Sequence, residues 1–130
     1  MKRQVKKFGD LAKELRTSKR ITLKEMAETL GISLSLLSDI ESDRRKPLNA
    51  EKIEKLIFKV DASETTRNEL YDLAARDNNG QIPEDIGDIF MYEEIGDIAR
   101  LALRKSNQGK LTIEDWKKFI QENDIGDDND

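Results

Sequence analysis

Residues 22–42 read TLKEMAETLGISLSLLSDIES. In the first half of this stretch the apolar residues recur at spacings of three and four, which places them on one face of a helix: Leu23, Met26, Ala27 and Leu30. The hydroxyl of Thr22 can cap this helix, and the hydroxyl of Ser33 can cap a second one. Gly31 lies between the two, where a left-handed residue closes a helix at little steric cost. The stretch therefore predicts two short helices joined by a tight turn, with the second helix running to about Ser42.

The sequence on either side of this pair predicts three more helices. Before the pair, apolar residues at helical spacing favour a helix over residues 8–19. After it, residues 43–47 form a charged break that ends in Pro, Asn49 can cap a fourth helix, and Ser63 can cap a fifth that ends near Arg76. No alternation of apolar and polar residues, which would indicate a strand, competes with these helices. The expected fold class is all-α.

The composition of the chain changes after the fifth helix. Residues 77–82 read DNNGQI, which is typical of a linker. We therefore expect a first domain over residues 1–76 and a helical segment over residues 83–123. Residues 124–130 include four aspartates and are expected to form an acidic, disordered tail.

The helical segment after the linker is less regular than the first domain. Its apolar residues favour one or two short helices that are interrupted around residues 92–96, and the letters SNQG at 106–109 favour a turn. Thr112, with Asp115 three residues later, is expected to begin a last helix that runs to about Gln121. The spacing of the acidic residues is not that of a metal-binding loop, and no phosphate-binding motif occurs.

The composition excludes several kinds of chemistry. The 130 residues include no Cys and no His, which excludes a disulfide, a thiolate nucleophile, a Cys/His zinc site and a histidine general base. No pair of nucleophile and base can be named among the remaining residues. No run of apolar residues approaches the ~20 that cross a bilayer, and no apolar signal region follows the basic N-terminus. We expect a soluble cytoplasmic protein that is not an enzyme and that needs no cofactor or metal.

Charge is distributed unevenly along the chain. Residues 1–60 hold 15 Lys or Arg and 9 Asp or Glu, a net charge of +6, whereas residues 61–130 hold 8 and 18, a net charge of −10. A basic half attracts a polyanion, because each phosphate that Lys or Arg neutralises releases condensed counterions. An acidic half is repelled by the same polymer. The two halves are therefore expected to face different partners.

Several features of residues 15–47 coincide with those of a known family. An Ala lies in the middle of the first helix of the pair, a Gly lies in the turn, a Ser caps the second helix, and residues 41–47 close the segment with Glu-x-x-x-x-Lys-Pro. This pattern resembles the Xre/Cro/C1 family of helix-turn-helix DNA-binding proteins, over roughly residues 8–75. The resemblance implies a five-helix, lambda-repressor-like DNA-binding domain, followed here by a short helical C-terminal segment. In that family the second helix of the pair lies in the major groove of double-stranded DNA.

The resemblance also assigns residues to the DNA interface. The base-facing positions would be Leu34, Ser35, Ser38 and Asp39. Leu34 could contact a thymine methyl group, Asp39 could accept from a cytosine amino group, and the serines could pair with either kind of base edge. Two clusters would contact phosphates, one before the base-facing helix and one after it: Lys19, Arg20, Thr22 and Lys24, and then Arg44, Arg45 and Lys46.

Other positions in the motif are assigned to structure. Arg16 and Glu41 match a family pair that joins the first and third helices by a partly buried ion pair. Leu37 and Ile40 are expected to lie on the inner face of their helix and to belong to the core. Leu23 departs from the family pattern, since many relatives have a Gln there that contacts phosphate.

The C-terminal segment is similar to tails found in some Xre-type regulators and antitoxins that are associated with ImmA/IrrE metalloprotease-like proteins. This likeness implies an arm that binds a second copy or a protein partner, metalloprotease-like or a toxin. The apolar residues assigned to that contact are Leu101, Trp116, Phe119 and Ile120. The plainer interpretation, in which such residues simply close a small core or a dimer interface, is favoured.

Two functions from different classes remain open at this point. The first is a sequence-specific transcriptional regulator, a dimer that represses a promoter by occupying a pseudo-palindromic operator. The alternative is an antitoxin or inhibitor that binds a protein partner through the acidic C-terminal half, with DNA binding secondary or lost. The motif and the basic clusters favour the regulator.

Overall fold

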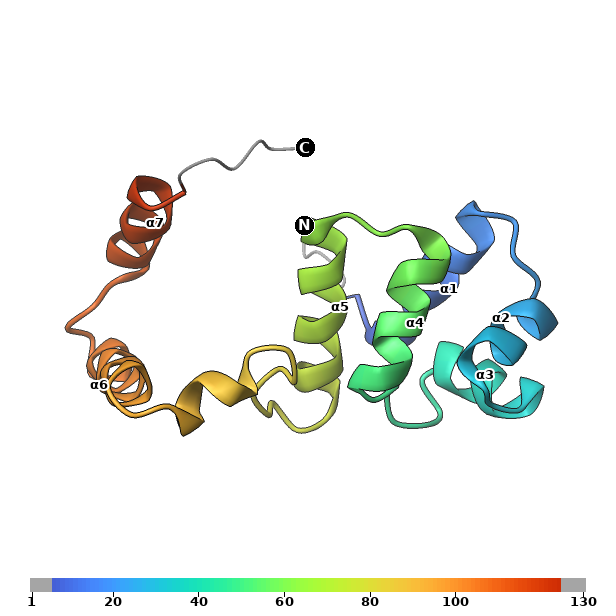
Figure 1. Ribbon diagram of the computed structural model, residues 1–130, viewed down its shortest axis with the longest axis horizontal. Coiled ribbons are helices and arrows are strands. Elements are labelled where there is room, and N and C mark those ends of the chain that lie inside the picture. Colours follow the sequence, from blue (N-terminus) through green and yellow to red (C-terminus); the bar gives the residue numbers. More distant parts are fainter. Residues whose placement is uncertain (1–5, 125–130) are drawn as a thin grey trace, which may run out of the picture. The chain divides into compact units, whose positions relative to one another are not determined.

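The computed structural model describes residues 6–124, which fold into seven α-helices and one short 3-10 helix (Figure 1). No strand occurs within these residues, so the predicted all-α fold is confirmed. Contacts along the chain divide it into two compact units, Met1–Ile86 and Gly87–Asp130. The domain limits predicted at residues 76 and 83 stay a prediction, and the predicted acidic tail lies outside the described residues except for Asp124.

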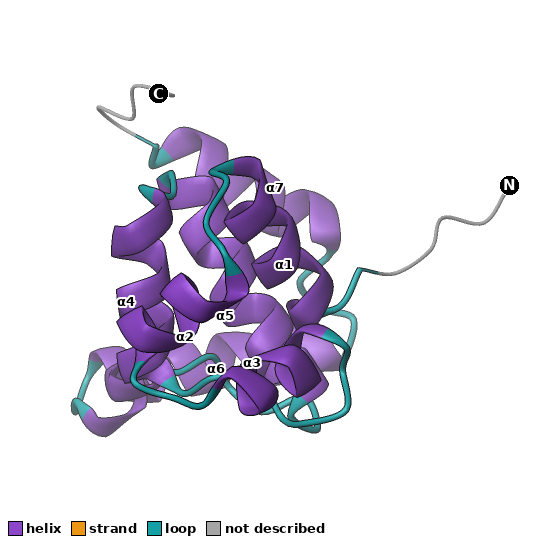
Figure 2. Ribbon diagram, turned by 90° about the vertical axis from the view of Figure 1, so that its right-hand side faces the viewer, coloured by secondary structure: helices purple, strands orange, loops and turns teal. Residues whose placement is uncertain are grey.

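The first unit contains five helices, as the sequence predicts: α1 (Phe8–Ser18), α2 (Leu23–Leu30), α3 (Leu34–Glu41), α4 (Ala50–Val60) and α5 (Glu64–Asp77). All four predicted caps are confirmed, because a backbone N–H three residues on donates to each cap side chain: Thr22, Ser33, Asn49 and Ser63. The helices α2 and α3 pack against each other and form one end of the unit (Figure 1 and Figure 2).

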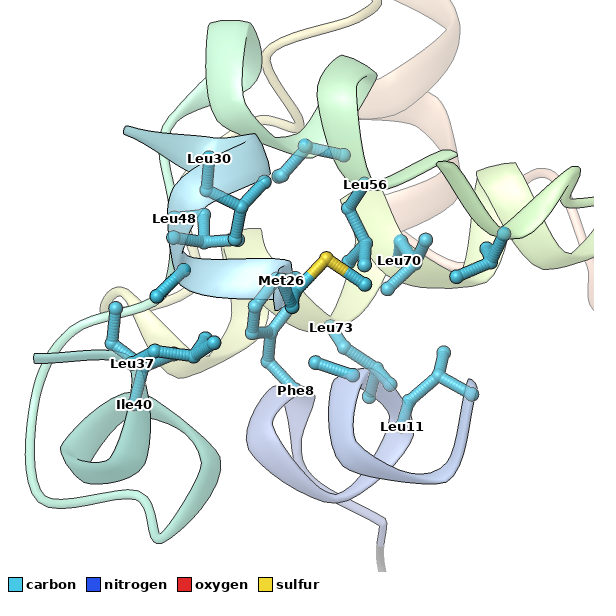
Figure 3. Packing of buried hydrophobic residues seen from close by; sticks show 14 of the residues in the cluster. Phe8, Leu11, Met26, Leu30, Leu37, Ile40, Leu48, Leu56, Leu70 and Leu73 are labelled. Atoms are coloured by element: carbon cyan, nitrogen blue, oxygen red, sulfur yellow. The ribbon is translucent and has the colours of Figure 1, made fainter. Parts of the chain in front are cut away.

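One hydrophobic core lies between the five helices (Figure 3). Each helix contributes at least one side chain that is less than 5% exposed, for example Phe8, Met26, Leu37, Ile53 and Leu70. The burial of each large apolar side chain contributes about 1.5–3 kcal/mol to folding. The expected inward orientation of Leu37 and Ile40 is confirmed, since both belong to this core. The core therefore holds α3 by its inner side and leaves its other side to solvent.

The second unit contains the short helix η1 (Gly87–Met91), α6 (Ile95–Asn107) and α7 (Ile113–Glu122). The expected interruption around residues 92–96 is confirmed, but the expected turn at 106–109 is wrong in its first half, because α6 continues to Asn107. Thr112 and Asp115 form a complete capping box at the start of α7, as predicted. The second unit is held by contacts between η1 and α6 and by few others.

Candidate nucleic-acid interface

The turn between α2 and α3 brings the two helices close together. Gly31 adopts the left-handed conformation with φ of 72°, and the Ser33 hydroxyl accepts the N–H of Leu36 at 3.1 Å. Ala27 in the middle of α2 is buried, and its small side chain lets α3 approach. The sequence thus folds locally into two short helices whose relative orientation is fixed by the turn and by the core.

The two sides of α3 differ in exposure. Leu37, Ile40 and Glu41 are buried on the inner side. By the helical repeat, Ser35, Ser38 and Asp39 lie roughly opposite Leu37 and Ile40, and Leu34 lies at the edge of that outer side. Leu34 is 48% exposed and Ser35 is exposed, whereas Ser38 and Asp39 are half-buried. The structure therefore brings these four residues together on one solvent-accessible surface, which we call the outer face of α3.

A buried ion pair attaches the C-terminal end of α3 to α1. The Arg16 guanidinium donates through Nε to Glu41 Oε2 at 2.7 Å and through a terminal nitrogen to Glu41 Oε1 at 3.0 Å. Its other terminal nitrogen donates to the carbonyl of Ile21 at 2.8 Å, just before α2. Arg16 is 9% exposed and Glu41 is 7% exposed. Removal of either partner would leave a buried charge, which costs about 3–5 kcal/mol.

Gly9 lies at a close approach between α1 and α3. A Cβ atom at this position would lie 2.3 Å from the carbonyl oxygen of Ile40 and 2.8 Å from that of Glu41. Only a glycine fits such a distance, so this residue sets how closely α3 lies on α1. This role was not predicted from the sequence, although a glycine near the start of a predicted helix is a signal for such a contact.

The structure pairs a predicted base-facing residue with a predicted phosphate-contacting residue. Arg44 donates through Nε to Asp39 Oδ1 at 3.2 Å, and a terminal nitrogen lies 3.2 Å from the same oxygen. Both side chains remain accessible, with 66% of Arg44 and 39% of Asp39 exposed, so the pair contributes at most about 1 kcal/mol. The guanidinium still partly neutralises a carboxylate that DNA phosphates would otherwise repel.

The remaining residues predicted to contact phosphate are all exposed: Lys19, Arg20, Thr22, Lys24, Arg45 and Lys46. Arg20 adopts the left-handed conformation with φ of 58°, and the hydroxyl of Thr22 already accepts the N–H of Glu25 at 3.0 Å. Lys7 lies beside the second cluster, because it lines the same surface depression as Arg45 and Lys46. The basic side chains therefore reach solvent around the start of α2 and in the loop between α3 and α4.

Asp77 is a further structural residue that the sequence analysis assigned to the linker. It is the last residue of α5, and its Oδ2 accepts the backbone N–H of Phe8 at 2.8 Å. The neighbouring Arg76 donates to the carbonyl of Lys6 at 3.3 Å. The first bond satisfies the N–H of Phe8 at the start of α1, and the two bonds link residues 69 and 70 positions apart in the chain. No local pattern in the sequence could indicate them.

The residues predicted to contact a partner lie in the second unit. Leu101 is 51% exposed, Phe119 is 56% exposed and Ile120 is 61% exposed. Trp116 is half-buried, and its indole N–H donates to the Ser106 hydroxyl at 2.9 Å. The structure thus engages Trp116 within the unit and leaves the other three side chains open to solvent.

Within residues 6–124, no group of three or more acidic residues is arranged to bind a metal ion. In the same part of the chain, no helix has the length and apolar character that crossing a bilayer requires.

Comparison with known protein families gives one match. A family model described as a helix-turn-helix domain matches residues 9–79, more than half of the chain. No curated protein and no solved structure matches the chain. The matched residues span α1 to α5 and end just after Asp77.

Proposed function

The chain belongs to the helix-turn-helix domain family of the Xre/Cro/C1 type, a family of DNA-binding domains, and on that premise we propose that it is a sequence-specific repressor. It acts as a dimer that occupies a pseudo-palindromic operator in the cytoplasm. Two copies of α3 then enter successive major grooves about one helical turn apart. The proposal assigns no enzymatic step to the chain.

The outer face of α3 is the observation that carries this proposal. It is accessible to solvent, while the inner face is fixed by the core and by the ion pair between Arg16 and Glu41. Exposed basic residues lie in the sequence on both sides of it. Such an arrangement suits a duplex, since phosphate contacts position the protein and base contacts select the sequence.

Each group on the outer face has a role that its chemistry allows. The hydroxyls of Ser35 and Ser38 donate to or accept from base edges, and Leu34 contacts a thymine methyl group. Arg44 can turn from Asp39 to a phosphate, which frees the Asp39 carboxylate to accept from a cytosine amino group. The outer face holds no long side chain that could form two bonds to one base, so phosphate contacts supply most of the affinity.

A gel-shift titration with the DNA upstream of the protein's own coding region, at two salt concentrations, tests this proposal. We expect Arg45→Ala to weaken binding to all duplexes and to reduce the salt slope by about 1. We expect Ser35→Ala to change the preference between sequences more than the overall affinity. Arg104→Ala, at an exposed arginine of the second unit, is the matched control and should change neither. Equal affinity for the upstream DNA and for random duplex would contradict the proposal.

A protein partner is the second candidate function, favoured by the exposed apolar residues of α7. Ile113, Phe119 and Ile120 are each more than half exposed. An antitoxin or inhibitor would cover such residues with its target, metalloprotease-like or a toxin. A pull-down with the full chain tests this, because Phe119→Asp should release a specific partner while Ser35→Ala should retain it. Identical captures with both variants would remove this candidate.

A further inference from the structure

One face of α6, together with the N-cap residue directly before the helix, carries a short column of four residues. Glu94, Ile98, Leu101 and Lys105 follow one another at spacings of four, three and four. An α-helix turns by about 100° per residue, so Ile98, Leu101 and Lys105 leave α6 within about 60° of one another, and Glu94 is the N-cap residue about one turn before Ile98. All four are exposed, with Ile98 at 59% and Leu101 at 51%. We call these residues the α6 column.

The contacts within the second unit lie on other sides of α6. A Cβ on Gly96 would lie 3.0 Å from the carbonyl oxygen of Ile89, and Arg100 donates to the carbonyl of Phe90 at 2.8 Å, so η1 packs on the side of Gly96 and Arg100. By the helical repeat, that side is roughly opposite to the α6 column. The hydrogen bond from Trp116 reaches Ser106, which lies outside the column as well. The column is therefore open in the single chain.

The α6 column is complementary to a reversed copy of itself. Consider a two-fold axis that crosses the helix midway between Ala99 and Arg100. This axis places Ile98 opposite Leu101 of a second copy, and it also places Glu94 opposite Lys105 of that copy. A single axis thus satisfies an apolar contact and a charge pair twice each, as an isologous interface requires. Two parallel helices would instead bring Glu94 near Glu94 and Lys105 near Lys105.

The charges at the two ends of the column are available for such a contact. Among the ion pairs of residues 6–124, none includes Glu94 or Lys105. Asp97 and Arg100, the other charged pair on this helix, are already engaged with each other. Ala102 flanks the column with a small side chain, which lets two helices approach each other closely.

We propose that two copies of the chain pair through an antiparallel contact between their α6 columns. The inference rests on the dimer of the proposed function and names the surface that forms it. One pair of 13-residue helices is a small interface, so we expect a dissociation constant in the micromolar range. Binding of both copies to one operator would then strengthen the association.

Sedimentation of the full chain from about 5 to about 200 µM tests the surface. The wild-type chain should be a dimer at the upper end of this range, and Leu101→Asp should weaken the dimer at least about thirtyfold. Leu103→Asp is the matched control, since Leu103 is 52% exposed on the same helix but lies outside the column. Circular dichroism checks that both variants keep their helices. A monomeric wild-type chain at 200 µM, or equal losses for the two variants, would overturn the proposal.

Charge reversal tests the antiparallel orientation. Glu94→Lys and Lys105→Glu should each weaken the dimer about tenfold, because each creates two like-charge contacts. The double variant should restore the affinity to within about threefold of the wild type. Each reversal also opposes the helix dipole, so effects on the helix alone would add in the double variant instead of cancelling. Failure of the double variant to restore the dimer would overturn the antiparallel pairing.

The same samples separate this proposal from the repressor itself. A chain that remains monomeric in sedimentation but still selects its upstream DNA would contradict the proposed α6 contact and support the proposed DNA recognition. A dimer that shows the expected charge-reversal behaviour but binds all duplexes equally would support the α6 contact and contradict sequence-specific DNA recognition. Arg45→Ala should weaken DNA binding and leave the dimer in sedimentation unchanged.

Discussion

In the first unit, sixteen hydrophobic side chains are buried in one core, whereas in the described part of the second unit Gly96 is the one buried residue. The second unit is not short of apolar residues, since Ile98, Leu103 and Phe119 are each more than half exposed. The first unit therefore contains what it needs to fold, and the second carries apolar surface that its own helices leave open. Segments of about 40 residues seldom stabilise themselves, which agrees with this difference.

Loss of one partner from an ion pair should give the largest difference in stability loss between the two units. Glu41→Ala leaves the Arg16 guanidinium buried and unpaired, so we expect the free energy of unfolding of the first unit to fall by about 3–5 kcal/mol. Asp97→Ala removes an exposed partner of Arg100 in the second unit and should cost less than about 1 kcal/mol. Urea unfolding followed by circular dichroism measures both.

A double variant checks that the charge, and not the shape, causes that loss. Replacement of Arg16 by Met together with Glu41→Leu removes both charges and should recover most of the stability. A double variant as unstable as Glu41→Ala would show that the geometry of the pair is itself required.

Truncation of a leucine gives the next largest difference. Leu56 is 1% exposed, and Leu56→Ala should cost about 2–5 kcal/mol through lost burial and the cavity that remains. Leu103 is 52% exposed, so Leu103→Ala should change stability by no more than about 0.5 kcal/mol. Urea titrations report the first unit by circular dichroism and the second by the fluorescence of Trp116, the only tryptophan. Equal effects would contradict the division of the chain into a packed and an open unit.

Glycine substitutions should show a smaller contrast. Gly9→Ala places a methyl group against the carbonyl of Ile40 and forces α3 away from α1, at a cost of about 1–3 kcal/mol. The displaced α3 should also bind operator DNA more weakly. Gly87→Ala is the control, because nothing lies within 4 Å of the position of its Cβ. Thermal unfolding and the gel-shift titration together measure the two variants, and a Gly9→Ala chain as stable as Gly87→Ala would be inconsistent with the close approach.

The effect of acid on the start of α7, in the second unit, should be the smallest of these. Hydrogen bonds from the backbone and side chain of Thr112 hold the pKa of Asp115 below its ordinary value. A lowered pKa stabilises the start of α7 at neutral pH, and this contribution is lost as the pH falls below about 4 and through the lower value of the folded state. Amide NMR shifts of Thr112 and Asp115 follow the loss. Asp115→Asn should remove the pH dependence, and an unchanged titration in that variant would point to another group.

Local patterns predicted the helices and their caps well. Thr22, Ser33, Asn49, Ser63 and Thr112 each lie at a helix start, because a cap depends only on residues three or four positions away. The spacing of apolar residues likewise identified the inner side of α3, which the core confirms for Leu37 and Ile40. The turn at 106–109 was placed too early, since SNQG has turn composition but α6 continues to Asn107 before it ends.

Contacts between distant residues could not be predicted in the same way. The close approach at Gly9 and the bond from Phe8 to Asp77 depend on how helices far apart in the sequence pack together. The outer face of α3 was predicted as a set of residues, but its DNA contacts stay a prediction. Their selectivity depends on bond geometry that neither periodicity nor composition contains.

The bond between Phe8 and Asp77 links the beginning of the first unit to its last helical residue. During synthesis the start of α1 is made before α5 and lacks this acceptor until 69 more residues have been added. At about 5–20 residues per second, that wait is roughly 3 to 14 seconds. A shortened chain that stops at Arg76 would lack the Asp77 carboxylate altogether, so an isolated DNA-binding fragment should extend at least to Asp77.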